Sequence, residues 1–330
     1  MPPINKIDYC FTEMGLMGKM PKDYPNMRVL ESQIMAWDCE HVPIQKVLQE
    51  ETKYEGNAVV VLPKGDMGKE IISWLVQNHF NTIKELKEKV TGELWFYQDG
   101  EAGYWNQHIV TLQIWWYNNV ASCDKIICPN EADIKYYKGM FKSKPVSVMR
   151  SIMAYVPEAE GFKKDKTIIS GPATREYNAF DQILIAKHFK ASIWIPPMGQ
   201  DRMPKDSWDT AASLDVSYLQ YMDWKTWMSK LSTYSYAVNM PGVTCAASFS
   251  LNCAWWGIPC VGNSHADTQR LCYPETSVEH NDIEGAIKIA DKLKTDPEFY
   301  KTVSDDAKMY ARTEFTKKKF LDLVFNYIHF

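Results

Sequence analysis

The chain has 330 residues, a net charge of −4, 45% hydrophobic residues and 24% charged residues. This length exceeds the usual size of a single hydrophobic core, so the sequence predicts two domains of globular rather than disordered composition. The acidic balance excludes a global attraction to nucleic acid, although a local basic channel stays open. No uncharged apolar run reaches the ~20 residues of a membrane-spanning helix.

The ends and the cysteines indicate the compartment. The first ten residues, MPPINKIDYC, lack the apolar core of a secretory signal, so we expect a cytoplasmic protein with no membrane span. The eight cysteines form no CxxC pair, which predicts buried, reduced thiols rather than a disulfide framework. The seven histidines have no metal-ligand spacing, so we expect no metal site.

Strand and helix patterns alternate through the first 150 residues. The apolar run at 58–62 has no alternation, which is typical of a strand covered on both faces. In chain order we expect strands at 7–11, 58–62, 94–97, 125–128 and 145–149, and helices at 27–41, 67–78, about 106–119 and 130–141. This order predicts a parallel, doubly wound sheet.

Residues 157–166, PEAEGFKKDK, interrupt the pattern and are interpreted as a linker between domains. We then expect strands at 167–170, 192–195, 216–221, 236–239 and 259–261, and helices at 178–189, 225–231 and 246–256. A helical tail follows, with capping residues at Asp282 and Asp296. The predicted domains are 1–156 and 167–314, and a C-terminal helix, 315–330, is expected to pack back toward the first.

The most informative stretch is 236–263, YAVNMPGVTCAASFSLNCAWWGIPCVGN. It predicts a strand, a Pro-Gly turn, a helix and a second strand. The turn and the helix start consist of small residues: Thr244, Ala246, Ala247 and Ser248. Small residues let a ligand approach the free N–H groups of a helix start, where the helix dipole favours anions. We therefore predict a phosphate cradle; an ordinary strand–helix–strand crossover is the alternative.

The second half resembles the C-terminal domain of GT-B nucleotide-sugar glycosyltransferases, above all the retaining group of glycogen and sucrose synthases. Three segments carry the resemblance: IISGPATREYNAFDQILIA, VSYLQYMDWKTWMSKLSTYSYAVNM and GVTCAASFSLNCAWWGIPCVGN. In the first half, ASCDKIICPNEADIKYYKGMF resembles the last strand and helix of the family's N-terminal domain. The resemblance implies an α/β fold with two Rossmann-like, doubly wound domains facing a cleft. It also implies a nucleotide-diphosphate sugar, expected to be a UDP-sugar, as donor, and no permanently bound cofactor.

The same resemblance implies the donor-site residues. Aligning GIPCV with the family's Gly-x-Pro strand places Thr244 and Asn252 where the family has two glutamates; Asn252 still offers an amide oxygen to the ribose, without charge. The family's diphosphate-binding arginine is matched by Arg175, which would stabilise the leaving phosphate, or is a solvated loop charge. The implied donor set is Gly171, Thr174, Arg175, Thr244, Ala246, Ala247, Ser248 and Asn252.

The candidate catalytic residues are carboxylates that follow strands of the first domain. An inverting transfer needs a base for the acceptor hydroxyl, whereas a retaining one can proceed without a protein base, and the sequence leaves this choice open. Asp99 is the first candidate, followed by Glu101 and then Glu13. The alternative is that Asp99-Gly100 forms a turn and Glu101 caps a helix. His265 and Asp267 either close over the nucleotide or are plain loop residues.

The sequence thus predicts a glycosyltransferase, hexosyl or pentosyl, acting on a hydroxyl acceptor. HIVTLQIWWYNN and NEADIKYY resemble transferases of tailed bacteriophages, some of which act on hydroxymethylated pyrimidines in phage DNA, which would place the protein in the host cytoplasm. Seven lysines either follow a DNA backbone or form solvated faces: Lys84, Lys87, Lys89, Lys135, Lys138, Lys142 and Lys144. The alternatives are a cell-surface glycan as acceptor, a GT-B-shaped sugar-nucleotide epimerase, and a non-catalytic nucleotide-binding module.

Overall fold

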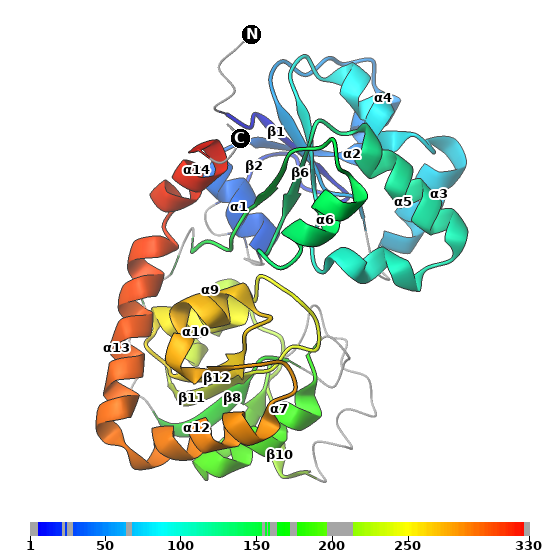
Figure 1. Ribbon diagram of the computed structural model, residues 1–330. Coiled ribbons are helices and arrows are strands. Elements are labelled where there is room, and N and C mark those ends of the chain that lie inside the picture. The colour runs from blue at the N-terminus through cyan, green and yellow to red at the C-terminus, as the bar shows by residue number, and fades with distance from the viewer. Residues whose placement is uncertain are drawn as a thin grey trace. The chain divides into compact units, whose positions relative to one another are not determined.

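The structure is a computed structural model that describes residues 6–21, 24, 29–63, 68–153, 156, 158, 164–171, 177–196 and 214–326. The chain divides into two compact units, each built on one sheet (Figure 1). Unit 1 comprises Met1–Tyr24, Leu30–Arg150 and Lys317–Phe330, and unit 2 comprises Pro25–Val29 and Ser151–Thr316. No helix in the described ranges has both the length and the apolar character needed to cross a membrane.

Unit 1 is built on a seven-stranded sheet in the order β2-β3-β1-β4-β5-β6-β7, parallel except for β2. Its strands are β1 Tyr9–Thr12, β2 Gly18–Lys19, β3 Glu40–Pro43, β4 Ala58–Val60, β5 Leu94–Tyr97, β6 Lys125–Cys128 and β7 Val146–Val148. Its helices are α1 Val29–Trp37, α2 Ile44–Gln49, α3 Lys69–Asn78, α4 Thr82–Lys89, the 3₁₀ helix η2 Ala102–Gln107, α5 Val110–Ser122, α6 Ile134–Met140 and α14 Lys317–Asn326. Every residue of β4, β5 and β6 is buried, as their continuous apolar runs predict.

Unit 2 is built on a six-stranded parallel sheet in the order β10-β9-β8-β11-β12-β13. Its strands are β8 Lys164–Ile169, β9 Ser192–Ile195, β10 Val216–Tyr218, β11 Tyr234–Asn239, β12 Cys260–Asn263 and β13 Ser277–Val278. Its main helices are α7 Ala179–Ala186, α9 Trp224–Leu231, α10 Ser248–Trp255, α11 Asp267–Cys272, α12 Ile283–Thr295 and α13 Pro297–Glu314. The strand order is that of a Rossmann sheet, and it reverses between β8 and β11. Ligands of such sheets bind at the carboxyl ends of the strands beside this reversal.

The helices at the end of unit 2 begin where the sequence predicts. Asp282 accepts a hydrogen bond from the N–H of Gly285, and Asp296 accepts one from Phe299, both at 2.9 Å. These are N-cap contacts, each of which satisfies one of the N–H groups that a helix start leaves without an internal partner.

The helix predicted at 27–41 is wrong at its C-terminal end. Helix α1 ends at Trp37, Asp38 has a left-handed backbone with φ 56°, and His41 lies in β3, a parallel neighbour of β1. The left-handed residue Asp38 ends α1. The extended residues after it keep the apolar spacing of the helix, so the sequence predicted a longer helix. The aromatic helix predicted from residue 106 also starts later, at Val110, because residues 102–107 form η2.

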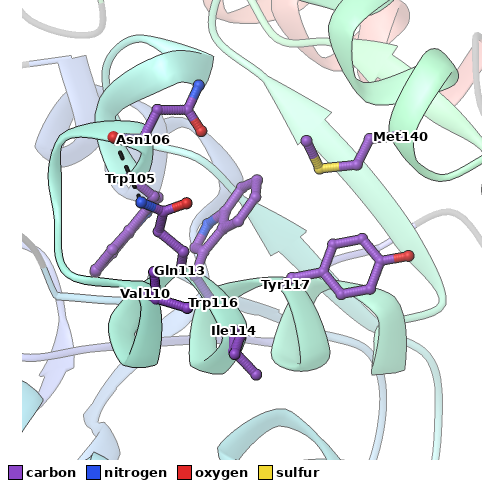
Figure 2. Close-up of a pocket in the computed structure, with 8 residues that line it drawn as sticks. All are labelled: Trp105, Asn106, Val110, Gln113, Ile114, Trp116, Tyr117 and Met140. Carbon is purple, nitrogen blue, oxygen red and sulfur yellow. Dashed lines mark hydrogen bonds between the residues drawn. The ribbon is translucent and has the colours of Figure 1, made fainter.

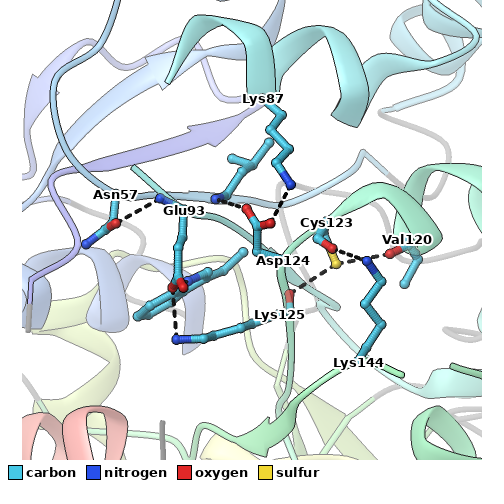
Figure 3. Close-up of polar contacts among 10 residues, drawn as sticks. Asn57, Lys87, Glu93, Val120, Cys123, Asp124, Lys125 and Lys144 are labelled. Atoms are coloured by element: carbon cyan, nitrogen blue, oxygen red, sulfur yellow. Dashed lines mark hydrogen bonds and ion pairs between the residues drawn. The ribbon is translucent and has the colours of Figure 1, made fainter. Parts of the chain in front are cut away.

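Charged side chains join the starts of β5 and β6 (Figure 3). One carboxylate oxygen of Asp124 accepts the N–H of Leu94 at 2.9 Å, and the other pairs with Lys87 of α4. Glu93 pairs with Lys125 at 2.8 Å. These contacts lie at the amino ends of β5 and β6. Ligands of such sheets bind at the opposite, carboxyl ends of the strands.

Replacing Asp124 by Ala leaves the N–H of fully buried Leu94 without its partner. We expect Asp124→Ala to lower the free energy of unfolding by about 1–3 kcal/mol, measured by chemical denaturation. The matched control is Asp305→Ala, because the side chain of Asp305 is 60% exposed and pairs with Lys301 one helix turn away. That substitution should change stability by less than about 0.5 kcal/mol. Equal losses in the two variants would contradict this account.

Candidate functional site

The candidate site lies in unit 2, in the loop that leads from β11 to α10. The loop begins at the carboxyl end of β11, next to the reversal of strand order. Its last residue, Ala247, has φ 57° and ψ 65°, a left-handed conformation that a residue with a Cβ rarely adopts. Such strained residues persist only where their surroundings hold them, and they cluster at functional sites.

The carbonyl groups of this loop are bound by the start of α11. The Cys245 carbonyl accepts the N–H of Asp267 at 3.1 Å, and the Ala246 carbonyl accepts the N–H of Thr268 at 3.3 Å. The Ala247 carbonyl accepts the hydroxyl of Thr268. Three consecutive carbonyls of the loop therefore have partners on one neighbouring helix.

The three amide groups that lead into α10, those of Ala246, Ala247 and Ser248, have no such partners among the described residues. In the described part of the chain, the N–H groups of Ala246, Ala247 and Ser248 donate to no protein acceptor. A left-handed residue between right-handed or extended ones makes successive N–H groups converge, a geometry that binds anions. The dipole of α10 adds partial positive charge at the same place. This arrangement can hold a phosphate group.

A buried asparagine holds the ends of the loop. Asn263, the last residue of β12, donates to the Pro241 carbonyl at 2.8 Å and accepts the N–H of His265 at 3.2 Å. The carbonyl of His265 in turn accepts the N–H of Cys245 at 3.2 Å. Asn263 is not among the residues predicted from the sequence, although a polar residue at the end of a buried strand was an available signal.

Beneath the loop, a buried polar network joins α10 to α11. The Ser250 hydroxyl accepts from the side chain of Asn239 at 2.6 Å and donates to the amide oxygen of Gln269 at 2.8 Å. Gln269 then donates to the Cys260 carbonyl at 2.9 Å. A Cβ on Gly262 would lie 2.5 Å from the Asn239 carbonyl oxygen, so only glycine allows these strands and α11 to pack so closely.

Asn252, expected to contact a ribose, is buried on α10. Its amide donates to the Ser248 carbonyl at 3.1 Å and accepts from the Trp227 indole at 3.3 Å. An amide oxygen has two lone pairs, so one acceptor position is used by Trp227 of α9. Thr244 is half-buried in the loop. The ligand roles assigned to both residues stay predictions.

The remaining predicted donor residues follow β8, on the other side of the strand reversal. A Cβ on Gly171 would lie 2.3 Å from the ring of Tyr177, so the turn after β8 requires glycine. Thr174 and Arg175 lie outside the described residues. The carboxyl ends of β8 and β11 are adjacent, which brings Gly171 and the β11–α10 loop to the same edge of the sheet.

In unit 1, Asp99 and Glu101 follow β5 at the carboxyl edge of the sheet. Both are partly exposed, and Gly100 between them has φ 88°. The chain bends at Gly100. The carboxylate of Asp133, from the loop after β6, accepts the N–H of Ala102 at 3.1 Å and caps η2.

Glu13, the third predicted carboxylate, is exposed beyond the end of β1. Strand β4 separates β1 from β5, so this position is two strand spacings, about 10 Å, from Asp99. Buried His41 accepts from the hydroxyl of Thr12 at 2.7 Å and donates to the Leu16 carbonyl. Burial lowers the pKa of His41, which keeps the ring neutral in this paired role.

A groove of about 250 Å³ lies on unit 1 between η2, α5 and α6 (Figure 2). Its walls include Trp105 and Trp116, which are buried core residues, and Tyr117, which is 45% exposed and stacks on Phe141. Two amides, Asn106 and Gln113, lie at its rim, and among the described residues no charged side chain lines it. The groove is thus suited to a neutral ligand.

Among the described residues, neither a metal centre nor a disulfide is present. Within the described ranges, no group of three or more His, Cys, Asp or Glu residues is arranged to hold a metal ion. All eight cysteines are free thiols, and seven of them are buried, as the sequence predicts.

No family model and no curated protein matches the sequence. Solved structures do match in fold. HepE from Anabaena in complex with UDP-glucose matches with a TM-score of 0.65 at 10% identity, over 98% of this chain and 99% of that one. Sucrose-phosphate synthase from Thermosynechococcus elongatus matches with a TM-score of 0.61 at 10% identity, over 95% and 86%.

A third match is an α-glucosyltransferase in complex with UDP and a 13-mer DNA containing an HMU base. Its TM-score is 0.58 at 11% identity, over 88% of this chain and 85% of that one. At these identities the likeness concerns the fold. The prediction of two parallel, Rossmann-like sheets is confirmed: the chain has the fold of GT-B glycosyltransferases.

Proposed function

We propose that the chain is a glycosyltransferase that moves a sugar from a UDP-sugar to a hydroxyl acceptor. The observation that carries the proposal is the loop before α10: its carbonyls at Cys245–Ala247 are bound by α11, and its amides at Ala246–Ser248 have no acceptor in the described part of the chain. This loop lies where a Rossmann sheet binds phosphates. The fold supports UDP as the nucleotide, because matching structures contain UDP or UDP-glucose.

In this proposal the amides hold the diphosphate of the donor. The charge that develops on the leaving phosphate is stabilised by these amides and by Arg175, whose guanidinium can pair with two phosphate oxygens. Asn252 remains the proposed contact to the ribose. Asp99 is the proposed base for the acceptor hydroxyl if the reaction inverts configuration, with Glu101 and Glu13 as further candidates.

Two acceptor classes have support. A hydroxymethylated pyrimidine in DNA is supported by the matching glucosyltransferase with an HMU base. However, three of the lysines proposed to follow a DNA backbone contact the protein itself: Lys87 pairs with Asp124, and Lys89 and Lys144 donate to backbone carbonyls. The uncharged groove beside η2 instead favours a neutral glycan. Exposed Lys84, Lys135, Lys138 and Lys142 remain available to either acceptor.

UDP binding tests the donor site directly. Ser248→Glu places a carboxylate at the first position of α10, where it repels the diphosphate but suits the helix dipole. We expect UDP to bind the wild-type protein and to bind this variant at least about tenfold more weakly by calorimetry, with no loss of thermal stability. Thr302→Glu, the same charge change on an exposed position of α13, should bind UDP normally. Unchanged UDP affinity in Ser248→Glu would remove the loop from the donor site.

Acceptor activation is tested by Asp99→Asn with UDP-glucose and two acceptors, a hydroxymethyl-pyrimidine oligonucleotide and a neutral oligosaccharide. We expect transfer to one acceptor to fall about 10²–10⁴-fold while UDP affinity is unchanged, because only the base is lost. Glu88→Gln, at an exposed position of α4, serves as the control. Full transfer activity in Asp99→Asn would assign the role of base to Glu101 or Glu13, or would indicate a retaining reaction.

The products separate the alternative functions. An epimerised UDP-sugar formed without acceptor would identify an epimerase, and UDP binding without turnover would identify a binding module.

A further inference from the structure

Two helix starts meet at the β11–α10 loop, and they use their N–H groups differently. A helix start has several N–H groups without partners inside the helix. In α11, the N–H groups of Asp267 and Thr268 are given to the carbonyls of Cys245 and Ala246. At the start of α10, the N–H groups of Ala246, Ala247 and Ser248 donate to no acceptor among the described residues. The start of α11 thus fixes the backbone of the loop that leads into α10.

Thr268 makes the central contact between them. Thr268 is 1% exposed and donates two hydrogen bonds to the loop. Its N–H donates to the Ala246 carbonyl, and its hydroxyl donates to the Ala247 carbonyl. The two acceptors are the consecutive carbonyls of the peptides before and after the Cα of left-handed Ala247. A rotation of Ala247 to the right-handed region would turn its carbonyl away from that hydroxyl.

We propose that Thr268 is a positioning residue for the donor diphosphate: its hydroxyl holds Ala247 in the left-handed conformation that aims the amides of Ala246–Ser248 at one anion. The proposal rests on the proposed function for the identity of that anion. Thr268 itself touches no substrate in this account. It acts through the backbone of Ala247, whose unfavourable conformation requires an external contact to persist.

The first test removes only the hydroxyl. Thr268→Val preserves the shape of the buried side chain, and we expect the dissociation constant for UDP to rise about tenfold by calorimetry. Thr268→Ser keeps the hydroxyl and should bind UDP within about twofold of wild type. Thr276→Val is the matched control, because the buried hydroxyl of Thr276 also donates to a backbone carbonyl, that of Cys260 at 2.5 Å. It should lower the melting temperature without changing UDP affinity, as a purely structural threonine would.

The second test uses glycine, which adopts the left-handed conformation without a contact to hold it. Ala247→Gly alone should bind UDP within about threefold of wild type. Added to Thr268→Val, it should restore most of the lost affinity. Unchanged UDP affinity in Thr268→Val, or no recovery in the double variant, would overturn the proposal.

Thermal unfolding without nucleotide separates this inference from the proposed function. If Thr268 holds Ala247, the fall in melting temperature caused by Thr268→Val is smaller in the Ala247→Gly background than in wild type, because the two residues are coupled. Additive shifts overturn the positioning role whatever the ligand. Coupled shifts in a protein that binds no UDP would retain the contact and refute the proposed donor instead.

Discussion

The candidate site depends on how one loop satisfies its backbone polar groups. A backbone carbonyl that is removed from water needs a partner, and at Cys245–Ala247 all three carbonyls find theirs on α11. The N–H groups on the other side of the same peptides are then directed away from protein acceptors. The anion-binding surface that we propose would thus be produced by the bonding of the carbonyls, without any charged side chain among these residues.

This arrangement requires that α10 and α11 keep a fixed distance. The chain Asn239–Ser250–Gln269 joins them beneath the loop, and every contact in it is buried. Fully satisfied buried networks are rigid, because each partner that is lost leaves an unpaired polar group in a low dielectric. Gly262 allows the close approach on which the network depends. The loop proposed to bind phosphate is therefore supported from the core of unit 2 rather than from its surface.

The sequence predicted those features whose cause is local. Continuous apolar runs identified β4, β5 and β6, and the small residues before α10 marked the loop that we propose as a phosphate cradle. It did not predict β3, because CEHV, which follows Asp38, continues the apolar spacing of the preceding helix. The helix ends before CEHV only because Asp38 is left-handed. It also did not predict α11 or the role of Thr268, because the partners of this short polar segment lie 21 or 22 residues earlier in the chain. Likewise, the contact of Asn252 with Trp227 comes from another helix and has no signal in the local pattern.

The carboxyl edges of the two sheets differ in chemical character. In unit 1, the lysines at the amino edge of the sheet are bound to Glu93 and Asp124, whereas the carboxyl edge carries Asp99 and Glu101 after β5. In unit 2, the carboxyl edge carries backbone N–H groups and the positive end of α10. The proposed transfer, if it inverts configuration, uses both kinds of group, since the acceptor hydroxyl loses a proton while the leaving phosphate gains charge.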